Sequence, residues 1–217
     1  MICIRKLSCE GIGNISANTG MMSNKENAIF FDRDGVVIND VHLLTDINDV
    51  VIPPLTIEAF KLISGIDYKK IVITNQTVIS RGLSTQSDVS MINDFIINKI
   101  FEETGCKIEK MYVCPHHPEA TLNQYKKVCE CRKPKPGMIL QASKDYGINL
   151  NKSWMIGDRI SDIVAGSTAG CKTILLQTGM HRADPIVSDS MNFSVRPDLI
   201  CKNLFEAAEI ITKEYQA

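Results

Sequence analysis

Three aspartates stand in positions that suit the binding of a cation and a phosphate. Asp32 and Asp34 lie two positions apart after the apolar run IFF, and Asp158 follows the run WMIG. Carboxylates that gather in a crevice of low dielectric repel one another unless a cation lies between them. Mg²⁺ prefers oxygen ligands and usually binds a few carboxylates together with a substrate phosphate. The alternative interpretation is that each acid is only a turn residue or a helix cap.

The spacing of the first two acids predicts how they point. In an extended segment, side chains two positions apart lie on the same side, so Asp32 and Asp34 are expected to face one ligand while Arg33 turns away. Gly35 would then let the chain turn sharply close to that ligand.

The elements that must position these acids follow from the alternation of short apolar runs with longer amphipathic segments. The runs are continuously apolar, as expected for parallel strands covered on both faces. The alternation predicts an α/β fold with a single doubly wound parallel sheet, in which ligands bind beyond the carboxyl ends of the strands. The expected strands are 28–32, 70–75, 110–115, 153–158 and 172–177, and the expected helices are 55–65, 85–104, 136–147, 160–169 and 200–213.

In order along the chain, these motifs resemble those of the haloacid dehalogenase superfamily of phosphohydrolases. Its four motifs match DRDGV at residues 32–36, Thr74 with Asn75, Lys133, and GDRISD at residues 157–162. Because several parts match in the right order at strand ends, the resemblance is specific. It implies a Rossmann-like sheet and the hydrolysis of a phosphate ester with the help of Mg²⁺.

The resemblance also implies a role for each matching residue. Asp32 would be the nucleophile that forms an aspartyl-phosphate. Asp34 would protonate the leaving oxygen and later deprotonate the hydrolytic water. Mg²⁺ would be held by Asp32, the backbone carbonyl of Asp34, and Asp158. The remaining groups expected to contact phosphate or substrate are Thr74, Asn75, Gln76, Thr77, Lys133 and Arg159.

A loop between the second and fourth motifs contains C-P-H, twelve intervening residues, and then C-E-C. Three thiols and one imidazole form a complete tetrahedral set for Zn²⁺, and such a closed set is structural rather than catalytic. The expected ligands are Cys114, His116, Cys129 and Cys131. His117 could take the place of His116, although C-x-H mirrors the spacing of C-x-C. The alternative is a chance grouping of buried cysteines and surface histidines.

The same loop narrows the resemblance to the D-glycero-D-manno-heptose 1,7-bisphosphate phosphatases, which are related to the histidinol phosphatases and serve bacterial nucleotide-heptose supply. That family shows CPHHP, a long spacer, CxCRKPxPGM and TNQSxxxRG, and the last appears here as TNQTVISRG at residues 74–82. The implied substrate is a small phosphorylated sugar. Arg132, next to Cys131, could bind its second phosphate in a bidentate way. The sugar-lining stretch of the family is replaced by DVHLLTD at residues 40–46.

Two other functions compete with this interpretation. The first is a histidinol-phosphate phosphatase or another small phosphomonoesterase, although histidinol phosphatases typically have a much shorter spacer. The second is a zinc-containing nucleic-acid-binding module or a polynucleotide 3′-phosphatase. With 24 basic against 25 acidic residues and 6% aromatic residues, the chain lacks the basic grooves and stacking rings that strand binding needs.

The 217 residues suffice for one sizeable α/β domain, which we expect over residues 27–217. Residues 1–26 show no periodicity, so they are expected to be a disordered or mis-annotated tail. No apolar run approaches the ~18 residues that would span a membrane, and no signal peptide is evident. We therefore expect a cytoplasmic monomer with no nucleic-acid or membrane partner. The intervals between motifs leave no room for a separate cap domain over the site.

Overall fold

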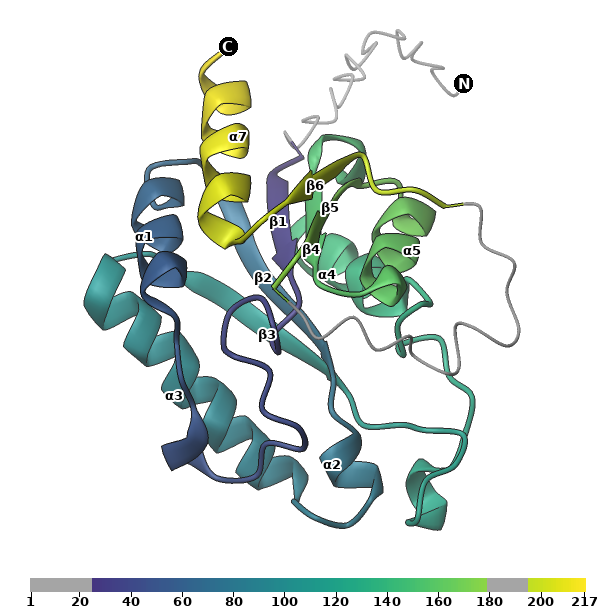
Figure 1. The fold of residues 1–217 in the computed structure, drawn as a ribbon. Helices are drawn as coiled ribbons and strands as arrows, with labels where there is room; N and C mark the ends of the chain where they lie inside the picture. Colours follow the sequence, from purple (N-terminus) through teal and green to yellow (C-terminus); the bar gives the residue numbers. More distant parts are fainter. Residues whose placement is uncertain (1–24, 179–194) are drawn as a thin grey trace, which may run out of the picture.

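A parallel sheet of six strands forms the centre of the protein in the computed structural model, which describes residues 25–178 and 195–217 (Figure 1). The order across the sheet is β3-β2-β1-β4-β5-β6, and every neighbouring pair is parallel. The strands are β1 (Asn27–Phe31), β2 (Tyr68–Asn75), β3 (Ile108–Cys114), β4 (Trp154–Gly157), β5 (Lys172–Leu176) and β6 (Leu199–Cys201). The prediction of a single parallel α/β sheet is confirmed.

Helices cover both faces of this sheet. Figure 1 shows α1, α3 and α7 on one face and α4 and α5 on the other. The α-helices are α1 (Pro54–Ile63), α2 (Thr77–Ser80), α3 (Gln86–Thr104), α4 (Gly137–Tyr146), α5 (Ile160–Ala169) and α7 (Leu204–Gln216). Short 3-10 turns form η1 (Ile47–Asp49), η2 (Asn123–Tyr125) and η3 (Leu150–Lys152).

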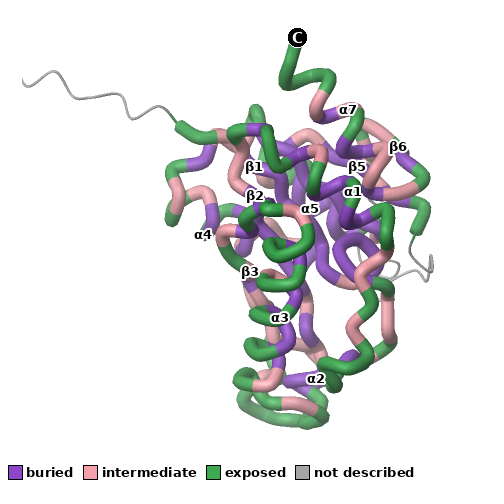
Figure 2. The backbone as a smooth tube through the Cα atoms, turned by 90° about the vertical axis from the view of Figure 1, so that its left-hand side faces the viewer, coloured by how far each residue is buried: buried purple, intermediate pink, exposed green. Residues whose placement is uncertain are grey.

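The central strand β1 shows why its sequence is apolar without alternation. Ile29 and Phe31 pack into the core beneath α1, α3 and α7, whereas Ala28 and Phe30 pack into the core beneath α4 and α5. All four are fully buried, because successive strand residues point to opposite faces and both faces are covered. In Figure 2 the buried colour accordingly runs along β1 and β2.

The end of the chain differs from the expected helix over 200–213. Residues 199–201 form the edge strand β6, and α7 begins only at Leu204. Asn203 sets this start, because its side chain accepts a hydrogen bond from the Glu206 backbone at 3.1 Å as a helix cap. The prediction was therefore wrong for residues 200–203. It also missed α2, which is a single turn with four residues.

The helix α3 begins as its sequence predicts. Thr85 accepts a hydrogen bond from the Asp88 backbone at 3.1 Å, and the Asp88 carboxylate accepts one from the Thr85 backbone at 2.8 Å. This reciprocal pair is a capping box. The capping box thus fixes the start of α3, the helix that contains Asn93.

The described residues between the strands form only the helices and turns named above, and none of them builds a second domain over the sheet. None of the described helices is long and apolar enough to cross a membrane. Of the expected tail, residues 1–24 lie outside the described residues. Glu26 is already ordered against the domain, since it pairs with Ile148.

Candidate active site

The site lies where the direction of the sheet's connections reverses. The strands β1 and β4 are neighbours at the centre of the sheet, although β2 and β3 lie between them in the sequence. Asp32 follows β1 directly, and its backbone N–H donates to the Ile156 carbonyl of β4 at 2.9 Å. Asp158 follows β4, and Thr74 lies near the end of β2. The carboxyl ends of adjacent strands thus bring these polar side chains together, as is usual in doubly wound sheets.

Three carboxylates form a buried cluster at this point. Oxygen atoms of Asp32, Asp158 and Asp162 lie within 4.8 Å of one another, and each residue is at most 7% exposed. Both carboxylate oxygens of Asp158 are buried and have no hydrogen-bond partner among the described residues. A buried carboxylate without a partner is costly unless it is protonated or binds a cation. The donor set therefore fits a hard divalent cation such as Mg²⁺.

Burial also changes the acidity of this cluster. It raises the pKa of Asp32 to about 7, with further repulsion from Asp162 and Asp34 and an opposing effect of Lys133. Burial likewise raises the pKa of Asp158 to about 8, and the negative charges of Asp32 and Asp162 act in the same direction. A cation bound between these groups would favour their ionised forms.

Asp162 was not assigned by the sequence argument, although it is the last residue of the GDRISD motif. One carboxylate oxygen lies 2.7 Å from the Lys133 ammonium, and the other accepts a hydrogen bond from the Arg159 backbone at 3.1 Å. Gly157 makes this approach possible, because a Cβ atom there would lie 2.1 Å from the Cβ of Asp162. The repeated acid at the end of the motif was the available signal.

Lys133 is held from several sides in the interior. Its ammonium lies 2.8 Å from an Asp32 oxygen and donates to the Ile73 carbonyl at 3.0 Å. The side chain of Asn75 donates to the Lys133 carbonyl and accepts from the Lys133 backbone, both at 3.1 Å. Burial alone lowers the pKa of Lys133, but Asp162 and Asp32 outweigh it and raise the pKa above its usual value. The residue is therefore a fixed buried cation beside Asp32.

Asp34 lies at the mouth of the same site, and its side chain is 20% exposed. One of its oxygens accepts hydrogen bonds from Nε and Nη2 of Arg33 at 3.3 and 3.0 Å. The other accepts from the Gln76 amide at 2.8 Å, and that amide also donates to the Thr74 hydroxyl at 2.8 Å. The expectation that Arg33 turns away was wrong, because the chain turns after Asp32 and does not continue as a strand.

Gly35 makes the turn after the two acids possible. Its φ of 81° lies in the left-handed region, which only glycine adopts without strain. An added Cβ would lie 2.5 Å from a carboxylate oxygen of Asp158. The glycine therefore allows the backbone to pass directly beside the buried acid of β4.

A cavity of about 290 Å³ opens in front of Asp32 and Asp34. Residues 40–44 form part of its wall, which places the stretch that departs from the family pattern beside the site. The structure brings the expected contacts to this wall: Thr74, Asn75, Gln76, Thr77, Arg132, Lys133 and Arg159. Arg81 and His117 also line it and were not expected to do so.

A larger cavity, of about 450 Å³, lies between α3 and the edge strand β3. It contains neither Asp32 nor Asp34 in its lining. We place the site in the smaller cavity, because the carboxylates and cations gather there.

An ion pair attaches the residue 40–44 segment to the end of β4. Arg159 donates through Nη2 to an Asp40 oxygen at 3.1 Å. Asp40 is 16% exposed at its side chain and Arg159 is 38% exposed. The pair joins the segment that follows the first motif to the fourth motif at the cavity wall.

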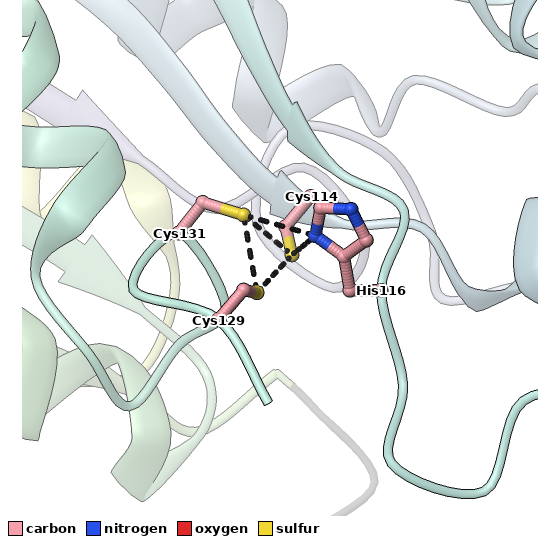
Figure 3. A group of neighbouring side chains, drawn as sticks. All are labelled: Cys114, His116, Cys129 and Cys131. Carbon is pink, nitrogen blue, oxygen red and sulfur yellow. Dashed lines mark hydrogen bonds between the residues drawn. The ribbon is translucent and has the colours of Figure 1, made fainter. Parts of the chain in front are cut away.

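The cysteines and histidine of the long loop point towards one another (Figure 3). The sulfur atoms of Cys114, Cys129 and Cys131 lie 3.1 to 3.6 Å apart, and Nδ1 of His116 lies 3.4 Å from that of Cys131. A tetrahedral zinc ion with bonds of about 2.3 Å needs sulfur atoms roughly 3.8 Å apart, so the group is close to a zinc site. The hydrogen bond between Cys114 and Cys131 lowers the pKa of Cys131 to about 5 and raises the pKa of Cys114, so Cys131 is the thiolate of this pair.

The two adjacent histidines differ in their surroundings. His116 faces the sulfur atoms, whereas Nδ1 of His117 accepts a hydrogen bond from the Glu119 backbone at 3.0 Å. Arg132 donates through Nη1 to the His116 carbonyl at 3.2 Å. The loop thus connects the cysteine–histidine cluster to Arg132, which lines the cavity.

Known proteins match both the chain and its fold. Residues 130–207 match the family described as HAD-hydrolase-like. The chain is 35% identical over 192 residues to D-glycero-alpha-D-manno-heptose-1,7-bisphosphate 7-phosphatase of Photorhabdus laumondii, covering 88% of this chain and all of that protein. D-glycero-beta-D-manno-heptose-1,7-bisphosphate 7-phosphatase of the same organism is 36% identical over 153 residues, covering 70% of this chain and 81% of that protein.

A solved structure has a fold similar to that of this chain. The crystal structure of D,D-heptose 1,7-bisphosphate phosphatase from B. bronchiseptica, complexed with magnesium and phosphate, has a TM-score of 0.72 and 28% identity, covering 87% of this chain and 99% of that chain. Fold and site together define a phosphatase of the haloacid dehalogenase superfamily. Within it, the chain belongs to the family of the heptose-1,7-bisphosphate phosphatases, as its motifs predicted.

Proposed function

We propose that this enzyme removes the 7-phosphate from D-glycero-D-manno-heptose 1,7-bisphosphate. The observation that carries the proposal is the meeting of Asp32, Asp34 and Lys133 at one cavity, in a chain whose relatives carry this activity in their names. The cationic side chains of Arg132 and Arg159 on the cavity wall complement a substrate with two phosphates.

The first step transfers the phosphoryl group to the protein. A carboxylate oxygen of Asp32 attacks phosphorus, and the bond to the sugar oxygen breaks with its electron pair on that oxygen. The sugar oxygen takes a proton from Asp34 as it leaves. Lys133, held beside Asp32 at 2.8 Å, offsets the negative charge of the phosphoryl oxygens, and the Thr74 hydroxyl and Asn75 backbone offer hydrogen bonds to them.

The second step returns Asp32 to its starting state. A water molecule attacks phosphorus and gives a proton to Asp34, while the bond between phosphorus and the Asp32 oxygen breaks. Inorganic phosphate leaves, Asp32 is a carboxylate again, and Asp34 is again protonated. The position of Asp34 at the cavity, where Asp32 also lies, suits both proton transfers.

Two metal ions complete the proposal. Mg²⁺ would be held by Asp32, the Asp34 backbone carbonyl and Asp158, and when bound it neutralises charge on the phosphoryl group. The unpartnered oxygens of Asp158 support this assignment. Zn²⁺ would be held by Cys114, His116, Cys129 and Cys131, whose ligand atoms already converge.

Arg132 is proposed to bind the second phosphate of the substrate. Its backbone follows Cys131, and its guanidinium is fixed to the His116 carbonyl at 3.2 Å. Zinc would therefore hold the residue in place and reduce the ordering cost of binding. A guanidinium can bind a phosphate with two parallel hydrogen bonds.

The test is phosphate release from both anomers of heptose 1,7-bisphosphate, a matching heptose monophosphate and histidinol phosphate. We expect the highest kcat/KM on one of the bisphosphates. Arg132→Ala should lower it by about 10- to 150-fold for the bisphosphate, which corresponds to losing ~1.5–3 kcal/mol, and much less for the monophosphate. Lys135→Ala, an exchange of a nearby, partly exposed cation that pairs with Glu130 and lies outside the cavity lining, is the control. A preference for histidinol phosphate would instead establish the histidinol-phosphatase alternative.

A further inference from the structure

Arg33 is a buried charge that the reaction described above does not use. It is 1% exposed and is the largest of the fully buried side chains among the described residues. Burying a guanidinium is costly unless its donors are paired with good geometry. Burial of the Arg33 guanidinium is therefore favourable only if its N–H groups form specific hydrogen bonds.

The guanidinium connects the mouth of the site to the interior of a helix. Nε and Nη2 both donate to the same oxygen of Asp34, Oδ1, at 3.3 and 3.0 Å. Nη1 donates to the side-chain oxygen of Asn93 at 3.0 Å. Asn93 belongs to α3 and is 5% exposed, so it is itself fixed by the core. The rigid fork of Arg33 therefore places Asp34 relative to α3.

The two oxygens of Asp34 are left with different surroundings. Oδ1 is occupied by two N–H donors of a group that has no acceptor. Among the described residues, Oδ2 accepts its one side-chain hydrogen bond from the Gln76 amide at 2.8 Å, and an amide can present either a donor or an acceptor. A proton on Asp34 is therefore accommodated at Oδ2 and opposed at Oδ1.

We propose that Arg33, anchored by Asn93, is a positioning residue that confines the transferable proton of Asp34 to Oδ2 and aims it at the leaving oxygen. The inference rests on the proposed function, because it assigns a task within the same reaction. When the bond between phosphorus and the sugar oxygen breaks, the proton passes from Oδ2 to that oxygen. The carboxylate left behind is stabilised by the positive charge of Arg33.

A purely structural role would have the same hydrogen bonds but different consequences. If Arg33 only attached the loop to α3, its loss would harm every substrate alike. A positioning role acts through proton donation, so its loss should depend on how much the leaving group needs a proton. A sugar alkoxide needs one, whereas the p-nitrophenolate released from p-nitrophenyl phosphate leaves without one.

The experiment compares the rate of phosphoryl transfer to Asp32, measured in a single turnover, with a sugar phosphate and with p-nitrophenyl phosphate for Arg33→Lys and Asn93→Leu. This first step is measured alone because the second step uses Asp34 as a base for both substrates. Lysine keeps the charge but cannot span Asp34 and Asn93 together. We expect this rate with the sugar phosphate to fall about 10- to 100-fold in both variants, which is part of the ~10²–10⁴ that general acid catalysis supplies. With p-nitrophenyl phosphate we expect this first-step rate to fall by less than about 3-fold, since p-nitrophenolate leaves without taking a proton from Asp34.

Asp34→Asn is the reference variant and should show the same selectivity with a larger fall. Adding Arg33→Lys or Asn93→Leu to Asp34→Asn should cause little further loss, because residues that act through one group are not additive. Asn98→Leu is the matched control, since Asn98 is an exposed asparagine on the same helix. Should Arg33→Lys not fold, Asn93→Leu carries the comparison alone.

Equal falls on the two substrates, no fall on either, or full additivity with Asp34→Asn would each overturn the positioning role. A wild-type enzyme that hydrolyses neither substrate with Mg²⁺ present would instead overturn the proposed function, and this inference with it. The two failures are therefore distinguishable by the activity of the wild type.

Discussion

The carboxylate cluster and the cysteine–histidine cluster are two candidate metal sites built in opposite ways. The first brings Asp32 together with Asp158 and Asp162, which lie far from it in the sequence, and all three are buried. The second takes its ligands from one segment between Cys114 and Cys131, and most of them are partly exposed. The sheet creates the first cluster, whereas the second requires only that one loop fold back on itself.

This difference separates chemistry from support. In the carboxylate cluster, the buried oxygens of Asp158 have no hydrogen-bond partner among the described residues, which is a cost that a substrate-linked cation can relieve. In the cysteine–histidine cluster, three sulfur atoms and one nitrogen converge, and four such ligands complete a tetrahedral site with no position for a substrate. Lys133 connects the two clusters, because it follows Cys131 by two residues and lies beside Asp32. Hydrogen bonds from Asn75 attach the Lys133 backbone to the end of β2.

The sharpest way to test the separation is to remove the nucleophile alone. Asp32→Asn should lower kcat by at least ~10³, because an amide cannot accept the phosphoryl group. The zinc content should stay at one equivalent per chain. Phosphate release with Mg²⁺ and metal analysis measure the two effects. More than a tenth of the wild-type kcat in the variant would refute the nucleophile assignment.

Removal of a zinc ligand should have the converse effect, with stability as the main loss. Cys129→Ser should lose zinc and lower Tm by roughly 10 °C, because ~3 kcal/mol is lost and a domain of this size shifts about 3 °C per kcal/mol. Cys201→Ala is the control, since Cys201 is buried far from the cluster in β6. Differential scanning calorimetry and metal analysis provide the readout. Equal zinc contents in the two variants would contradict a structural zinc site.

The carboxylate cluster should also make the stability of the protein depend on pH. The pKa values of Asp32 and Asp158 are raised to about 7 and about 8, so the folded metal-free protein holds more protons than the unfolded chain between about pH 4 and 8. Its stability should therefore fall as pH rises through this window. Mg²⁺ competes with those protons, so the Tm gain on adding Mg²⁺ should grow from pH 5 to pH 8. A gain that is constant with pH would place the cation away from these carboxylates.

The smallest effect is expected at the ion pair between Arg159 and Asp40. Asp40→Asn should raise KM for the bisphosphate by about 2- to 5-fold and leave kcat unchanged, because partly exposed pairs contribute ~0.2–1 kcal/mol. Asp49→Asn, on an exposed acid of η1, serves as the control. Steady-state kinetics decide the matter. A fall in kcat at constant KM would mean that the pair supports the reacting groups and not the cavity wall.

The sequence was sufficient for the features that depend on pattern and spacing. Continuous apolar runs predicted the five long or central strands, and ligand spacing predicted which cysteines and histidine would converge. The three-residue strand β6 was missed, because so short a segment carries no period and is defined only by its pairing with β5. Arg33 and Asp162 were missed for a related reason. Their tasks depend on Asn93 and Lys133, which only the tertiary fold brings near.

The central place of β1 has a consequence for how the protein is made. The backbone of Ala28 in β1 donates to the Ser153 hydroxyl beside β4, across 125 residues of chain. During synthesis β1 emerges first, yet its partner on this side emerges only after helices α1 to α4. Pairing over such a separation is slow, because the chain pays the entropy of loop closure before the contact forms. In refolding, the cysteine–histidine loop can therefore close early, and enzymatic activity returns only with this late, long-range step.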